Sequence, residues 1–178
     1  MTAVLRAAGF KVRARPADVA EVEEDADTLE GNALLKARAM AAAVGLPAVA
    51  DDTGLFVDAL NGRPGVRSAR YAGPRAAYAD NVARLLGELA AVPAPRRAHF
   101  RTVVALAHPD GSSLVVEGVL AGQVTETPRG GGGFGYDSVF EADETPGQTL
   151  AELSPEAKNR FSHRGRALAA LAAALAVR

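Results

Sequence analysis

Ala50-Asp51-Asp52-Thr53-Gly54 follows the short apolar run Pro47–Ala50 and sets two adjacent carboxylates before a hydroxyl and a glycine. An acid at the end of a buried strand, beside a turn, is well placed to hold a divalent cation or to activate a water. Neighbouring side chains of a strand point to opposite faces, so we do not expect Asp51 and Asp52 to face one site. The same residue types are also frequent in plain turns, so the pentapeptide alone leaves a purely structural role open.

Length and composition favour one soluble globular domain over residues 1–178. The chain is long enough for one sizeable core and too short for two ordinary domains. Its net charge of −1 gives no basic field for nucleic acid. It has no cysteine, which excludes thiolate metal sites, and no apolar run near the ~20 residues of a membrane helix. Without a visible secretory signal, we expect a cytoplasmic protein that has neither nucleic-acid nor membrane partners.

Apolar periodicity and turn signals predict alternating helices and strands. Helices are expected over Met1–Ala8, Thr28–Val44, Ala76–Leu89, a short segment after Ser154, and Gly165–Val177, and strands over Phe10–Val12, Ala48–Ala50, Leu55–Val57, His99–His108, Ser113–Val124 and Ser138–Phe140. Pro109–Ser112 separates two of these strands and predicts an antiparallel hairpin. The pattern indicates an α/β fold, with a mixed twisted sheet that contains this hairpin and helices on both sides.

Two of the predicted helices carry further local signals. Asp27 and Glu30 have the spacing of a capping box at the start of the helix that ends at Gly45. In the next helix, five side chains share one stripe that we interpret as core: Tyr78, Val82, Leu85, Leu86 and Leu89.

Polar residues gather in a few segments that together suit a nucleotide. They are the acidic segment Pro16–Asp27, the pentapeptide, the glycine-rich Gly130–Asp137, and Lys158 with His163-Arg164. Carboxylates can hold a metal, cationic side chains can bind phosphates or carbonyl oxygens, and an aromatic ring can stack on a base. No Walker A motif or dinucleotide-binding glycine fingerprint is present. Taken singly, these segments are also compatible with a solvated acidic loop, a surface lysine at position 36 and a flexible glycine loop.

Four motifs give the chain a specific resemblance. They are Ala-Asp-Asp-Thr-Gly-Leu at 50–55, Ser68-Ala69-Arg70-Tyr71, Gly132-Gly133-Phe134-Gly135-Tyr136-Asp137, and the segment Leu153–Gly165. In order and spacing the chain resembles the inosine/xanthosine triphosphate pyrophosphatases, the Ham1-like non-canonical purine NTP pyrophosphatases. The resemblance implies Mg²⁺-dependent hydrolysis of ITP, dITP and XTP to the monophosphate and pyrophosphate, which cleanses the nucleotide pool. It also implies a homodimer.

The resemblance further implies residue roles. Asp52 would be the proton acceptor and a metal ligand, and Glu24 the second metal carboxylate, with Glu23 as the alternative. Substrate contacts would come from Thr53, Lys36, Phe134, Gly135, Tyr136, Asp137, Lys158, His163 and Arg164. Donors among them would pair with the 6-oxygen of hypoxanthine or xanthine and would be left unpaired by adenine. Guanine also carries that oxygen, so this argument does not explain its rejection.

The beginning of the chain departs from the resemblance. The family usually starts with a strand and a Thr/Ser-x-Asn-x-x-Lys phosphate loop, whereas Met1 aligns within the first helix. We therefore expect the first strand and the phosphate loop to be missing. A start site assigned too far downstream would explain the difference. A real truncation would instead leave a weakly active or non-catalytic purine-nucleotide-binding protein.

Overall fold

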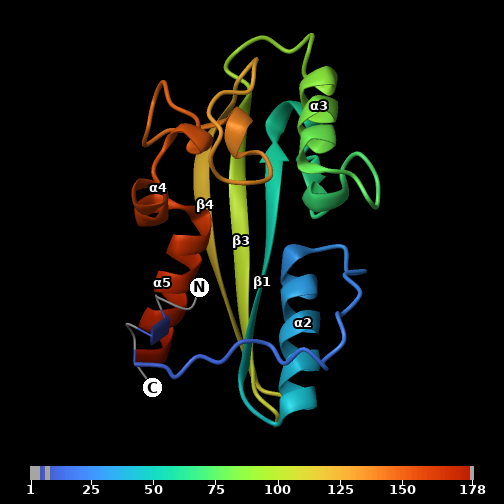
Figure 1. Cartoon of the computed structure of the whole chain (residues 1–178), viewed down its shortest axis with the longest axis vertical. Coiled ribbons are helices and arrows are strands. Elements are labelled where there is room, and N and C mark those ends of the chain that lie inside the picture. Colours follow the sequence, from blue (N-terminus) through green and yellow to red (C-terminus); the bar gives the residue numbers. More distant parts are fainter. Residues whose placement is uncertain (1–4, 7–8, 177–178) are drawn as a thin grey trace. The chain divides into compact units, whose positions relative to one another are not determined.

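The computed structural model describes residues 5–6 and 9–176, and within them a single five-stranded sheet with the strand order β2-β1-β3-β4-β5 (Figure 1). The strands are β1 (Ala48–Val57), β2 (Pro64–Gly65), β3 (Arg97–Ala107), β4 (Ser113–Val124) and β5 (Phe140–Ala142), and the helices are α2 (Leu29–Val44), α3 (Tyr78–Glu88), α4 (Pro155–Phe161) and α5 (His163–Ala176). β1 pairs antiparallel with β2, and β4 with β5. The predicted α/β class is confirmed, and so is the hairpin, because β3 and β4 are neighbours joined by a turn in which His108 N–H donates to Ser112 O at 2.9 Å.

The chain groups into two compact units. Unit 1 comprises Met1–Thr53, Thr102–Gly118 and His163–Arg178, and unit 2 comprises Gly54–Arg101 and Val119–Ser162. The strands β1, β3 and β4 each contribute residues to both units. Each unit has a core of its own: Val104, Leu168 and Leu171 are buried in unit 1, and Leu55, Leu85 and Phe140 in unit 2. That residues 1–178 form a single domain stays a prediction.

β1 is one continuous strand, where the sequence predicted two strands around a turn. Asp51, Asp52, Thr53 and Gly54 therefore lie inside the strand, and the expected turn is wrong. The reason is the neighbouring strand: a Cβ on Gly54 would lie 2.5 Å from the carbonyl oxygen of Gly65 in β2. The glycine thus permits close approach of two backbones instead of a chain reversal.

α2 has the predicted extent and a different cap. Thr28 Oγ1 accepts the N–H of Gly31 at 3.0 Å, so the N-cap is Thr28, and the capping box of Asp27 with Glu30 is wrong. A Thr hydroxyl in an extended residue is one of the favoured N-cap groups. At the other end, Gly45 takes a left-handed conformation with φ 65° and donates its N–H to Ala41 O, as predicted.

The next helix, α3, has the predicted position and one wrong core residue. Val82, Leu85 and Leu89 are buried, whereas Tyr78 is 56% exposed at the first turn. The apolar stripe therefore begins one turn after the start of the helix.

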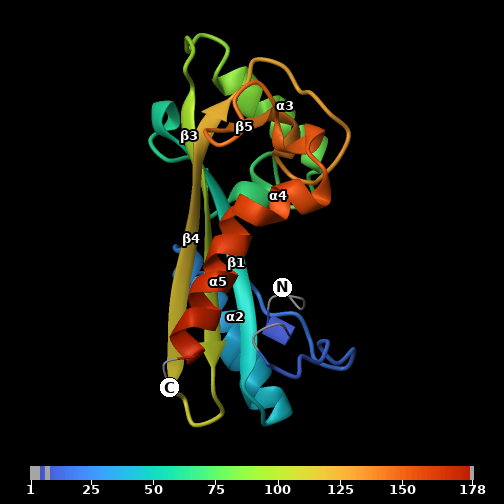
Figure 2. The same ribbon diagram turned by 90° about the vertical axis from the view of Figure 1, so that its left-hand side faces the viewer.

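The last two helices position residues of interest. Ser154 Oγ caps α4 by accepting the N–H of Ala157, as predicted. α5 begins at His163, two residues earlier than predicted, so His163 and Arg164 occupy its first turn. Figure 2 shows α5 running beside β4. This approach depends on Gly118 of β4, where a Cβ would collide with the backbone of His163 and Ala167.

Two predicted strands are absent or displaced within the described residues. Phe10–Val12 has no regular secondary structure, and the N–H of Phe10 donates to Leu5 O instead of to a neighbouring strand. Gly9 has φ 87°, as expected of a helix-ending glycine, while most of the predicted helix Met1–Ala8 lies outside the described residues. Asp137–Val139 forms a 3₁₀ turn, so the last strand begins at Phe140.

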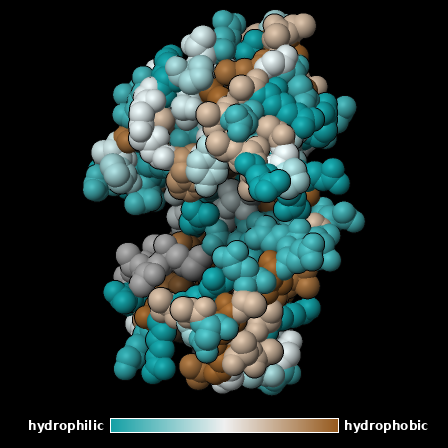
Figure 3. Space-filling model, turned by 45° about the vertical axis from the view of Figure 1, so that its right-hand side comes forward, coloured by the Kyte–Doolittle hydropathy of each residue, from teal (hydrophilic) through white to brown (hydrophobic). Residues whose placement is uncertain are grey.

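No helix among residues 5–6 and 9–176 is both long and apolar enough to cross a membrane. Hydrophilic residues cover most of the face shown in Figure 3, and apolar residues form separate patches between them.

Candidate active site

Asp52 stands at the centre of a charged cluster in unit 1. Asn32 Nδ2, on α2, donates to Asp52 Oδ2 at 3.1 Å, and Lys36 Nζ, one turn further along, lies 3.2 Å from Asp52 Oδ1. The same ammonium lies 2.9 Å from Glu24 Oε1. Two carboxylates from separate segments therefore converge on one cation, and Glu23, the alternative to Glu24, is exposed.

The charges in this cluster depend on one another. Burial raises the pKa of Asp52 above its usual 3.8, although Lys36 and the Asn32 hydrogen bond act in the opposite direction. Burial also opposes the charge on Lys36, but hydrogen bonds and attraction from Glu24 and Asp52 outweigh it and raise the pKa of Lys36 above 10.5. The lysine therefore stays charged at neutral pH, and Asp52 is a stronger base than an exposed aspartate.

This pair of acids fits Mg²⁺. Both carboxylates supply hard oxygen atoms, and both already point at a single positive charge. Mg²⁺ commonly takes one or two protein carboxylates and completes its shell with water and substrate phosphates. In the part of the chain that the structure describes, no group of three or more His, Cys, Asp or Glu gathers to form a fuller protein cage. Glu24 and Asp52 are thus the residues that would hold the ion.

Asn32 belongs to this cluster although sequence reasoning missed it. Its side chain is fully buried, and its Oδ1 accepts the N–H of Ala26 at 3.0 Å while its Nδ2 reaches Asp52. It thereby joins the acidic segment and α2 to the Asp52 carboxylate. An asparagine within a helix is disfavoured unless its side chain has a partner, and that was the available signal.

The opposite face of β1 carries a second set of contacts in unit 1. Arg164 Nε donates to Asp51 Oδ2 at 2.9 Å. Thr53 Oγ1 lies 2.7 Å from Thr102 Oγ1, which in turn lies 2.6 Å from His163 Nδ1. Asp51 and Asp52 therefore face opposite sides of the strand, as the alternation predicts. Because Asp51 meets α5 and Asp52 meets α2, helices cover both faces of β1, also as predicted.

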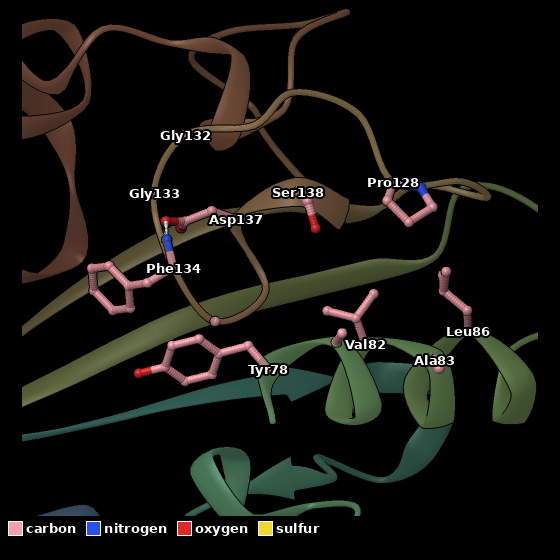
Figure 4. A pocket seen from close by; sticks show the side chains of 12 residues that line it. Tyr78, Val82, Ala83, Leu86, Pro128, Gly132, Gly133, Phe134, Asp137 and Ser138 are labelled. Atoms are coloured by element: carbon pink, nitrogen blue, oxygen red, sulfur yellow. Dashed lines mark hydrogen bonds between the residues drawn. The ribbon is translucent and has the colours of Figure 1, made fainter. Parts of the chain in front are cut away.

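A cavity of about 480 Å³ lies in unit 2 between α3 and the glycine-rich loop (Figure 4). The α3 side contributes apolar groups that include Tyr78, Val82 and Leu86, and the loop side contributes Gly133 and Phe134. The rings of Tyr78 and Phe134 approach with centroids 6.4 Å apart and are both more than half exposed. An open apolar wall with aromatic rings is suited to a flat heterocycle.

Asp137 organises the loop at this cavity. Its Oδ2 accepts the N–H of Phe134 at 2.7 Å and also accepts from Lys158 Nζ. The Lys158 ammonium in turn lies 4.8 Å from the centroid of the Phe134 ring. Gly133 has φ 73°, and a Cβ there would collide with the Asp137 carboxylate, so only glycine suits the position.

Two neighbours complete this loop. Gly135 has φ 63° and lines the cavity, while Tyr136 is buried and its hydroxyl donates to Ser68 O at 2.9 Å. Burial raises the pKa of Tyr136, so the phenol stays protonated. The predicted site residues thus fall into three groups. Unit 1 holds Glu24, Lys36 and Asp52 in one group and Thr53, His163 and Arg164 in another, on the opposite face of β1, and unit 2 holds Phe134, Gly135, Tyr136, Asp137 and Lys158.

Comparisons with known proteins identify relatives of this chain. The model of the Ham1 family matches residues 1–174. A dITP/XTP pyrophosphatase of Geobacter sulfurreducens is 55% identical over 86% of this chain and 77% of its own length, and one of Methylococcus capsulatus is 49% identical over 97% and 87%. Among solved structures, a HAM1 protein of Coxiella burnetii superimposes with a TM-score of 0.82 at 43% identity, covering 90% of this chain and 82% of its own.

A further solved structure, named nucleoside-triphosphatase / dITP/XTP pyrophosphatase, comes from Mycobacterium abscessus. It has a TM-score of 0.73 and 48% identity, covering 85% of this chain and 80% of its own. The fold is shared with these solved structures. This chain belongs to the Ham1 family.

Proposed function

We propose that this chain is a Mg²⁺-dependent nucleoside triphosphate pyrophosphatase that hydrolyses ITP, dITP and XTP to the monophosphate and pyrophosphate. Such an activity removes non-canonical purine nucleotides from the nucleotide pool. Relatives of about 50% identity that are named dITP/XTP pyrophosphatases support the substrate class. The observation that carries the chemistry is the convergence of Glu24 and Asp52 on one positive charge.

In the proposed reaction, a water attacks the α-phosphorus and the bond to the oxygen that bridges to the β-phosphorus breaks. Asp52, whose carboxylate is held by Asn32 and Lys36, accepts the proton of that water. The departing pyrophosphate keeps the electron pair of the broken bond. Lys36 supplies a fixed positive charge beside Asp52. Mg²⁺ held by Glu24 and Asp52 would neutralise part of the negative charge of the phosphates.

The residues proposed for substrate recognition are those that the resemblance implies. We assign stacking on the purine to Phe134, and donation to its 6-oxygen to Lys158, His163 and Arg164. The other proposed substrate contacts are Lys36, Thr53, Gly135, Tyr136 and Asp137. The contacts of Asp137 and Tyr136 support a role for both in positioning the loop. Asp137 holds Phe134 and Lys158, and Tyr136 holds the loop through Ser68.

We also propose that the protein is a homodimer in the cytoplasm, without nucleic-acid or membrane partners. The net charge of −1 supports the exclusion of nucleic acid. Light scattering coupled to size-exclusion chromatography should give twice the 18.3 kDa chain mass. A peak at the monomer mass at micromolar concentration would contradict the dimer.

The activity is tested by measuring pyrophosphate release from ITP, dITP, XTP, ATP and GTP with and without Mg²⁺. We expect release from the first three, and a loss of about 10³-fold in kcat for Asp52→Asn, because the general base is removed. Glu30→Gln, which changes an exposed acid on α2, is the matched control and should retain activity. Full turnover by Asp52→Asn would overturn the assignment of the base. Calorimetric binding of ITP by the wild-type chain without product would instead indicate a non-catalytic nucleotide binder.

A further inference from the structure

Three side chains of unit 1 form a hydrogen-bonded series whose middle member has no role in the proposed reaction. Thr53 and His163 are proposed substrate contacts, and Thr102 lies between them, 2.7 Å from Thr53 Oγ1 and 2.6 Å from His163 Nδ1. Thr102 is fully buried in β3, and His163 is 5% exposed. Thr102 therefore touches the proposed contacts on either side of it and is itself closed off from solvent.

The hydroxyl of Thr102 can determine the tautomer of His163. A Thr hydroxyl has one proton, so Thr102 donates in one of these hydrogen bonds and accepts in the other. If it donates to His163 Nδ1, a neutral imidazole must carry its proton on Nε2. If it accepts from Nδ1, the neutral ring has no proton on Nε2. Thr102 thus selects whether His163 presents a donor or an acceptor from its other nitrogen.

His163 is buried and is the first residue of α5. The proposed recognition of a purine 6-oxygen requires a donor from His163. With Nδ1 directed at Thr102, that donor is Nε2–H. This step rests on the proposed function.

We propose that Thr102 is a positioning residue for nucleotide recognition. Its hydroxyl accepts from Thr53 and donates to His163 Nδ1, and it thereby holds the imidazole in the Nε2–H tautomer and in one orientation. Gly118 contributes to the same arrangement, because the first turn of α5 lies against β4 where a Cβ would collide with the carbonyl of His163.

Three variants separate this role from a structural one. Thr102→Val keeps the shape of the side chain and removes the hydroxyl, and Thr102→Ser keeps the hydroxyl and removes the methyl group. Val104→Ala is the matched control, since Val104 is buried two residues along the same strand in the core of unit 1 and its side chain has no hydrogen-bonding group. Urea denaturation checks that each variant folds and measures its loss of stability.

The first readout needs no substrate. Long-range ¹H–¹⁵N spectra of protein labelled at histidine distinguish the two tautomers, and with three histidines in the chain, His99 and His108 serve as internal references. We expect the Nε2–H tautomer at His163 in the wild type, in Thr102→Ser and in Val104→Ala, and a mixture of forms in Thr102→Val. The Nδ1–H tautomer in the wild type, or an unchanged spectrum in Thr102→Val, would overturn the proposal.

The second readout is steady-state hydrolysis of ITP. Thr102→Val should raise KM about tenfold and leave kcat within about twofold, because a misplaced donor weakens binding without touching the reacting phosphorus. Thr102→Ser should restore a KM close to that of the wild type. An equal rise in KM for Val104→Ala would show that lost stability alone explains the effect. Should the wild type fail to hydrolyse ITP, the proposed function fails, while the tautomer of His163 still decides the role of Thr102.

Discussion

At the scale of single residues, two adjacent aspartates have separate surroundings because they alternate along β1. Asp52 meets Asn32 and Lys36 of α2, and Asp51 meets Arg164 of α5. Asp52 therefore shares the Lys36 ammonium with a second acid, whereas Asp51 accepts from the guanidinium of Arg164. Adjacency in the sequence gives no common role, since the pleat of the strand decides which helix each side chain meets.

Asn32 carries the first prediction at this scale. Asn32→Leu removes both hydrogen bonds of the side chain and leaves the Ala26 N–H and Asp52 Oδ2 without that partner. We expect a loss of about 2–3 kcal/mol in the free energy of unfolding, because buried polar groups lose their partners. We also expect a fall of about tenfold in kcat/KM for ITP, because Asp52 is less well positioned. Urea denaturation and steady-state kinetics measure the two effects.

Asn81 offers a matched control for Asn32. It is equally buried, and it accepts the N–H of Ala72 at 2.7 Å and donates to Ala69 O at 3.0 Å. Asn81→Leu should lose a comparable free energy of unfolding without a comparable fall in kcat/KM. Equal kinetic losses in the two variants would contradict a specific link between Asn32 and Asp52.

Some residues of the candidate site come from the resemblance, and two further residues were missed. Asp52, Glu24 and Lys36 were inferred from the resemblance, and the structure places Lys36 within hydrogen-bond reach of both carboxylates. Asn32 and Thr102 were missed because they act through contacts with Asp52 and His163, which are 20 and 61 residues away in the chain. Neither contact leaves a local pattern of spacing or periodicity.

At the scale of elements, the sequence predicted those features of helices and strands that depend on residues close together in the chain. The limits of α2, the hairpin of β3 and β4, and the serine cap of α4 all depend on residues within a few positions, and all three are confirmed. The turn expected within β1 is wrong because Gly54 lies close against the backbone of Gly65 in β2, eleven residues further along. A glycine that admits a neighbouring strand and one that bends the chain cannot be distinguished from the sequence.

The end of α3 carries a prediction about pH. Tyr71 Oη donates to Glu88 Oε2 at 2.7 Å, and Arg84 Nε donates to Oε1 at 2.9 Å. These hydrogen bonds lower the pKa of Glu88 below 4.5. Between that lowered value and 4.5 the unfolded chain binds more protons. The stabilisation is therefore complete above pH 4.5 and is lost as the pH falls through the folded pKa.

Glu88→Gln tests the direction of this pH dependence of stability. Because the Glu88 side chain is only partly buried, we expect Tm at pH 7 to fall by only about 1–3 °C. The difference in Tm from the wild type should stay constant from pH 7 to about 5.5 and shrink below 4.5. Thermal melts across this range provide the measurement, with Glu126→Gln in an exposed loop as the control. A difference that grows on acidification would contradict the lowered pKa.

At the scale of the whole molecule, composition and motifs predicted the class of protein. The absence of cysteine, the balanced charge and four motifs in order led to an α/β nucleotide pyrophosphatase of the Ham1 type, and the family is confirmed. The division into two compact units was not predicted, because β1, β3 and β4 contribute residues to both and no linker or change in composition marks the boundary. Units that share strands leave no signal of the kind that separates domains in a sequence.

Binding of metal and substrate should stabilise the whole chain, because a ligand that binds only the folded state raises its free energy of unfolding. A non-hydrolysable ITP analogue at about 100 times its Kd, with Mg²⁺, should add about 2.7 kcal/mol and raise Tm by about 5–10 °C. Chelation by EDTA should remove most of the shift, since Glu24 and Asp52 are then left facing the phosphates without the ion. The double variant Glu24→Gln with Asp52→Asn should show a small shift that no longer depends on Mg²⁺. A wild-type shift of equal size with EDTA and with Mg²⁺ would contradict the assignment of these two carboxylates to the metal.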